Sequence, residues 1–170
     1  ILHDCTPSDQ LDALARGIID IGFIGPAPKD IPRGVEIRPW RTEPLHVLVP
    51  RGHDWCGRTS IAFSELEGQS LVTVSPEAAP AFHLWLQDLF VRAGIRPLFV
   101  QRADRARAVC SMAAVSGTPA LLIQSACHAL DGCQALPLLD SDGETYDLTL
   151  VLAYRPDVRE RVEALLGKGG

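Results

Sequence analysis

The chain is poor in lysine, and its positive charge is carried almost entirely by scattered arginines. Lysine occurs only as Lys29 and Lys168, and the formal net charge of the 170-residue chain is −5. This balance argues against nucleic-acid binding by the chain itself, because phosphate contacts need clustered Lys and Arg. The nearest approach to a cluster is Arg102, Arg105 and Arg107, a modest basic patch that we interpret as a solvated helix face.

Long hydrophobic runs and a targeting signal are also missing. No stretch approaches the roughly 18 consecutive apolar residues that indicate a transmembrane helix, so no membrane contact is predicted. No basic segment followed by an apolar one opens the sequence, so no signal peptide is visible. The chain starts abruptly with Ile1 and Leu2, which read as a strand already under way. We therefore expect a fragment of a longer protein.

The cysteines do not form a disulfide framework. There are five, an odd number, and no C-x-x-C spacing occurs among them. Chains from oxidising compartments usually carry an even, regularly spaced set. The sequence therefore indicates a reduced, cytoplasmic setting.

No pattern of a metal site or of an enzyme is present. The candidate metal ligands have no standard zinc spacing. The G-x-S-x-G turn of a serine nucleophile is absent, and the acidic residues are not paired for acid–base catalysis. We predict no metal, no cofactor and no enzymatic activity. The candidate ligands considered are His3, Cys5, His46, His53, Cys127, His128 and Cys133.

The clearest local pattern is a capped helix near the start of the chain. Thr6 is a good N-cap, Pro7 suits the first helical position, and Asp9 follows three residues after the cap. Gly17 fits the C′ position. The hydroxyls of Thr6 and Ser8, with the free N–H groups of a helix start, are suited to bind a carboxylate. The alternative is a cap that binds no ligand.

Two further segments are candidates for the same site. A second helix opens at Pro80, Ala81 and Phe82, and the Phe82 ring either faces a planar ligand or packs in the core. Gly25 and Pro26 end an apolar run, residues 18–24, which predicts a central parallel strand. Ligands of open α/β sheets bind beyond the carboxyl ends of strands, which makes this turn a third candidate.

Strands and helices alternate along the chain, which favours parallel βα units. Residues 44–50 and 145–154 are long enough to pass between two lobes. Two crossing strands would form a hinge that closes on a ligand.

The order and spacing of several segments resemble the effector-binding domain of LysR-type transcriptional regulators. The resemblance implies two Rossmann-like α/β lobes joined by two crossing strands, the type 2 periplasmic-binding-protein fold. It implies a first lobe at residues 1–44 that lacks its first strand and helix, a second at 45–145, and a return to the first at 146–170. The matching segments are residues 6–23, 44–53, 63–68, 80–82, 90–97 and 137–140.

The same resemblance implies a function. A small organic anion, such as an aromatic-degradation metabolite, would bind between the lobes. DNA would be bound only through an N-terminal helix-turn-helix absent from this sequence. The domain would form a homodimer, and the full-length protein a tetramer. The alternative is a solute-binding protein of a transport system with the same lobe plan. The effector site would comprise Thr6, Ser8, Gly25, Pro26, Pro80, Ala81 and Phe82.

Overall fold

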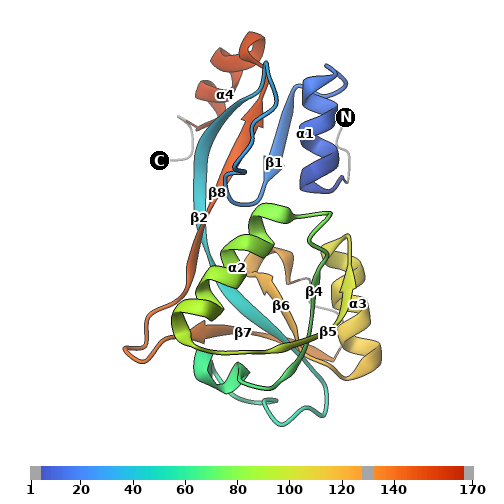
Figure 1. The fold of residues 1–170 in the computed structure, drawn as a ribbon, viewed down its shortest axis with the longest axis vertical. Coiled ribbons are helices and arrows are strands. Elements are labelled where there is room, and N and C mark those ends of the chain that lie inside the picture. The colour runs from blue at the N-terminus through green and yellow to red at the C-terminus, as the bar shows by residue number, and fades with distance from the viewer. Residues whose placement is uncertain (1–4, 128–131, 167–170) are drawn as a thin grey trace.

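Two strands run between the lobes of the molecule and connect them. In the computed structural model, which describes residues 5–127 and 132–166, these strands are β2 (Glu36–Pro50) and β8 (Asp147–Tyr154) (Figure 1). They pair antiparallel from Glu36 opposite Tyr154 to Pro44 opposite Asp147. Beyond Pro44, β2 pairs instead with two strands of the second lobe. Residues 44–50, predicted to pass between the lobes, are therefore the second half of one 15-residue strand.

Lobe I, the upper lobe in Figure 1, is built on an antiparallel sheet of order β1-β8-β2. The prediction of a central parallel strand was wrong for residues 5–127 and 132–166, because the pairing of β1 there is with β8 and antiparallel. Its apolar run includes Phe23, whose exposed fraction is 50%. Helix α1 packs on one face of this sheet and α4 on the other. Besides β2 and β8, the elements of lobe I are α1 (Pro7–Ala15), β1 (Ile21–Ile24), η3 (Pro156–Val158) and α4 (Arg159–Leu166).

Lobe II contains the rest of the sheet, and here the parallel βα units occur. Strand β4 runs parallel to both β5 and β6. Residues of β2 alternate between a core under α2, which includes Val47, and a core under α3, which includes Leu48. Residues 124–126 form a 3₁₀ turn, and residues 128–131 lie outside the described part. The elements are β3 (Ile61–Ala62), η1 (Phe63–Leu66), β4 (Ser70–Val74), α2 (Pro80–Ala93), β5 (Leu98–Ala103), α3 (Ala106–Ser116), β6 (Ala120–Ile123), η2 (Gln124–Ala126) and β7 (Cys133–Leu139).

The structure confirms the start and the end that the sequence predicts for α1. The backbone N–H of Asp9 donates to Thr6 Oγ1 at 3.1 Å, and the N–H of Thr6 donates to Asp9 Oδ2 at 3.4 Å, which forms a capping box. Gly17 follows the helix with φ +70°, a conformation that strongly favours glycine. A Cβ there would also lie 3.0 Å from Nη1 of Arg155.

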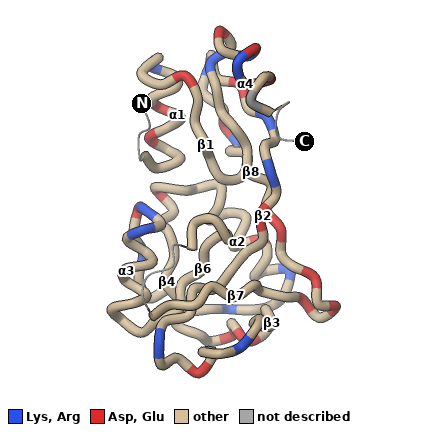
Figure 2. The backbone as a smooth tube through the Cα atoms, turned by 180° about the vertical axis from the view of Figure 1, so that it is seen from behind, with Lys and Arg blue, Asp and Glu red and all other residues tan. Residues whose placement is uncertain are grey.

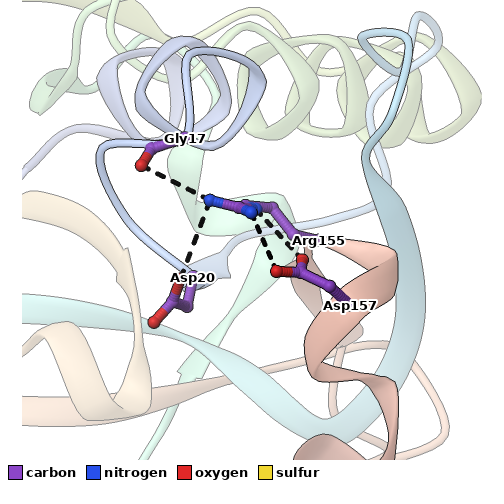
Figure 3. A network of polar contacts seen from close by, with 4 residues as sticks. All are labelled: Gly17, Asp20, Arg155 and Asp157. Carbon is purple, nitrogen blue, oxygen red and sulfur yellow. Dashed lines mark hydrogen bonds and ion pairs between the residues drawn. The ribbon is translucent and has the colours of Figure 1, made fainter.

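Arg155, just beyond β8, binds the loop that leads from α1 to β1 through a hydrogen bond and an ion pair (Figure 3). Its guanidinium donates to the Gly17 carbonyl at 3.4 Å and lies 4.0 Å from the carboxylate of Asp20. Two further bonds, of 3.1 and 2.8 Å, join it to Asp157. The arginine thus holds the end of α1, the entry to β1 and the start of η3 together. The orientation of α1 toward the cleft depends on this loop.

No described helix is both long enough and apolar enough to cross a membrane. We retain as a proposal the division into a first lobe at residues 1–44, a second at 45–145 and a return segment at 146–170.

Candidate functional site

A cleft of about 720 Å³ lies between the two lobes. Lobe I contributes the start of α1 and the end of β1. Lobe II contributes the ends of β4 and β6 and the starts of α2 and α3. This volume is within the ordinary range for small-molecule sites. The lining residues are Cys5, Thr6, Pro7, Gln10, Phe23, Gly25, Val74, Ala79, Phe82, Asp104, Arg105, Ala106, Arg107, Leu122, Ile123, Ala126 and Leu148.

Three of the seven predicted site residues line this cleft. Thr6 and Gly25 come from lobe I and Phe82 from lobe II, so the fold brings together the three segments that the sequence singled out. The other four line a smaller, almost wholly apolar cavity of about 30 Å³, between the start of α1 and the first turn of α2. These four are Ser8, Pro26, Pro80 and Ala81.

Ser8 connects the two lobes. Its hydroxyl donates to the carbonyl of Glu77 at 2.9 Å, with a second contact to the carbonyl of Ala78 at 3.3 Å. Its backbone N–H donates to the same Ala78 carbonyl at 3.3 Å. Both donors of Ser8, which were predicted to bind an anion, are therefore used in holding α1 against the segment before α2.

Replacing Ser8 with alanine is expected to lower the free energy of unfolding by about 1 kcal/mol, because the hydroxyl bonds between the lobes are lost. Urea unfolding measures this cost. Ser64→Ala is the control, because the exposed Ser64 hydroxyl makes no described hydrogen bond, and its cost should stay within about 0.5 kcal/mol. Equal effects of the two substitutions would show that the contact between the lobes contributes nothing to stability.

The charged residues that line the described part of the cleft are at the start of α3. Asp104, Arg105 and Arg107 line it, and Figure 2 shows basic segments at the end of α3 that faces lobe I. The interpretation of the basic patch as a solvated face was therefore incomplete, because Arg102 alone of the three lies off the cleft. The signal that could have found this segment is its place after β5, at the carboxyl end of a parallel strand.

Asp104 is engaged within the protein. One of its carboxylate oxygens accepts a 2.6 Å hydrogen bond from the hydroxyl of the buried Ser75. The Ser75 oxygen in turn accepts from the N–H of Ala78 at 3.2 Å. This chain of bonds joins the entry of α3 to the entry of α2, so the lobe II wall of the cleft is fixed by internal contacts.

Most of the remaining lining is apolar. Phe82 is buried in the main core of lobe II, stacks on Trp85 and still reaches the cleft. The ring therefore packs in the core, as one of the two sequence interpretations had it, and contact with a planar ligand stays a prediction. On lobe I, Phe23 packs edge-to-face on Trp40 with ring centroids 4.7 Å apart, and the guanidinium of Arg41 lies 4.1 Å above the Trp40 ring. These contacts hold an exposed aromatic ring at the cleft.

Burial shifts the pKa values of two titratable groups of lobe II. Burial raises the pKa of the Cys127 thiol to about 12, so it stays protonated at neutral pH. Burial also lowers the pKa of His46, which lies on β2 and not in the cleft lining. Within residues 5–127 and 132–166, no three His, Cys, Asp or Glu side chains converge as a metal ion would require.

Two α/β lobes, a pair of crossing strands and a cleft between the lobes define a bilobal ligand-binding domain. A family model described as LysR substrate binding domain matches residues 1–167, and the chain belongs to this family. The family is one of binding domains and not of enzymes. The fold class predicted from the sequence is thereby confirmed.

Relatives and solved structures agree with this assignment. The HTH-type transcriptional regulator AlsR of Bacillus subtilis (strain 168) is 27% identical over 111 residues, which are 65% of this chain and 36% of AlsR. The structure of CbnR, a LysR family transcriptional regulator, has a TM-score of 0.78 at 19% identity, over 99% of this chain and 57% of CbnR. The chain therefore spans little more than half, or less, of these proteins.

One similar structure is a regulatory domain with a bound small molecule. The regulatory domain of CcmR from Synechocystis PCC6803, in complex with 2-PG, has a TM-score of 0.72 at 15% identity. The match covers 96% of this chain and 79% of that one.

Proposed function

We propose that the chain is the effector-sensing domain of a LysR-type transcriptional regulator and that it binds a small organic anion between its lobes. The observation that carries this proposal is the cleft of about 720 Å³, with arginines on one wall and aromatic rings on both lobes. Aromatic-degradation metabolites are the first class of compounds to test, because Phe23 and Phe82 present rings to a planar ligand.

The effect of the ligand would pass through the crossing strands. A compound shifts the arrangement of the lobes only as far as its affinities for the two arrangements differ. In this proposal the signal reaches DNA through an N-terminal helix-turn-helix outside this sequence. The chain itself has a net charge of −5, which is unfavourable for contact with phosphates.

We further propose that the regulator is cytoplasmic and that its domains associate as homodimers, with a tetramer in the full-length protein. The exposed Leu84 and Val91 of α2 are available for such contacts. Size-exclusion chromatography with light scattering tests the oligomeric state directly.

The test of the binding function is calorimetric titration of the chain with a panel of aromatic and aliphatic carboxylic acids. At least one acid should bind, and the double substitution Thr6→Ala with Phe82→Ala should weaken the best binder, because both residues line the cleft. Val115→Ala, near the end of α3 and 90% exposed, is the control and should leave binding unchanged. Unchanged affinity in the double variant would show that the ligand binds elsewhere.

A further inference from the structure

Among the described residues, the charge in the cleft is confined to one lobe. Its charged lining residues, Asp104, Arg105 and Arg107, all belong to lobe II. The described lining residues that lobe I contributes carry no charge. These lobe I residues are Cys5, Thr6, Pro7, Gln10, Phe23 and Gly25.

The backbone N–H groups at the start of α1, on lobe I, already have hydrogen-bond acceptors within the protein. The carboxylate of Asp9 accepts from the Thr6 N–H, the Asp9 N–H donates to Thr6 Oγ1, and the Ser8 N–H donates to Ala78. Pro7 has no N–H. An anion placed here would find no free first-turn N–H and would lie near the Asp9 carboxylate, so this helix start is unsuited to bind an anionic group.

Lobe II offers the opposite environment. Two arginines against one aspartate leave one positive charge, and that aspartate is already hydrogen-bonded to Ser75. The Arg107 guanidinium has no hydrogen bond or ion pair with any residue in 5–127 or 132–166. The first turn of α3, where it lies, has no side-chain cap. Arg107 is therefore the cation available to a ligand.

The rest of the cleft suits an apolar body. Val74, Phe82, Leu122, Ile123 and Leu148 reach the lining from lobe II and from the crossing strand β8. Covering such a surface with hydrocarbon is favourable because apolar area is removed from water. The surface has no polar group that could compensate for the desolvation of a second charge.

We propose that the cleft selects amphipathic monoanions over dianions, with the single anionic group held by Arg107 and the apolar body between Phe82 and the ends of β6 and β8. This inference rests on the proposed function and specifies its ligand class. Lobe I then contributes shape and apolar contact, and lobe II contributes the charge.

Calorimetry with a matched series tests the proposal. The probes are 2-naphthoate, its neutral analogue 2-naphthamide and the dianion 2,6-naphthalenedicarboxylate, with octanoate as a flexible monoanion. At least one monoanion should bind, and the dianion should bind about tenfold more weakly than 2-naphthoate because its second carboxylate faces uncharged lobe I. Arg107→Gln should weaken monoanion binding about tenfold or more and leave the amide unchanged. Arg102→Gln, an exposed arginine off the cleft, is the matched control and should change nothing.

The outcomes separate the proposal from the function on which it rests. Tighter binding of the dianion, or monoanion binding that is insensitive to Arg107→Gln, overturns the selectivity while a cleft ligand still supports the sensing function. Failure of both monoanions to bind overturns it as well. Failure of the whole acid panel, dianions included, contradicts the sensing function itself.

Discussion

Replacing Phe82 with alanine is expected to lower the free energy of unfolding by about 3 kcal/mol and to remove one wall of the cleft. The ring is only 7% exposed and belongs to the main core of lobe II. It also stacks on Trp85, with ring centroids 6.0 Å apart. Truncation therefore removes buried area, leaves a cavity and deletes a surface that the ligand would contact. Urea unfolding measures the first effect and ligand titration the second.

Leu84→Ala provides the control for Phe82. Leu84 lies two residues further along α2 and is 44% exposed, so its truncation should cost less than about 1 kcal/mol. If both variants lose the same stability, Phe82 is not part of the core. A Phe82→Leu variant retains much of the buried area and separates loss of binding from loss of folding.

Replacing Glu43 with alanine is expected to lower the free energy of unfolding by about 2 kcal/mol. The side chain is 8% exposed, pairs with Arg41 and accepts a 3.0 Å hydrogen bond from the N–H of Ser125. It joins the crossing strand β2 to η2, whose Ala126 lines the cleft. Because Arg41 is nearly half exposed, most of the cost should come from the unpaired Ser125 N–H and not from the ion pair.

Two further variants examine the role of Glu43. Glu43→Gln keeps an acceptor for Ser125 and should recover more than half of the lost stability. Glu163→Ala breaks an exposed ion pair with Arg38 at 3.7 Å and should cost less than about 0.5 kcal/mol. Hydrogen exchange should show faster exchange of the Ser125 amide in Glu43→Ala only. An unchanged exchange rate would mean that this bond does not hold η2 in place.

The residues on the two sides of the cleft are held in different ways. On lobe I, Phe23 projects from an edge strand and is held by Trp40, which in turn packs under Arg41. On lobe II, Asp104 and Ser75 hold the entries of α2 and α3 together. Glu43 lies between these two arrangements on β2. A change in lobe arrangement would therefore act on a small number of polar contacts near the crossing strands.

Local chemistry alone predicted the helices and their caps. The Thr6 and Asp9 pair, Pro7 and Gly17 define both ends of α1 because every interaction involved lies within a few residues. Gly94 and Gly117 likewise end α2 and α3, with φ of 67° and 70°. The buried strands β4 and β6 were also visible, as short apolar runs.

Only the tertiary structure shows which strands pair and which hydrogen-bond donors of α1 are already used within the protein. An apolar run such as the one that contains β1 shows that a strand forms but not which neighbour it pairs with, and in the described part of the chain its partner is the antiparallel β8. The sequence predicted that the N–H groups of α1 are free for an anion. The fold brings Ala78, 70 residues away, against Ser8, and the capping box uses the other donors.

The capped helix, the family and the two-lobed plan were therefore determined by the sequence itself, because they depend on short-range chemistry and on the order of motifs. The face of the cleft that carries the charge was decided only by folding. Arg105 and Arg107 lie at the cleft because β5 and α3 direct them there. Long-range packing sets which helix start meets the ligand, and no local pattern encodes that choice.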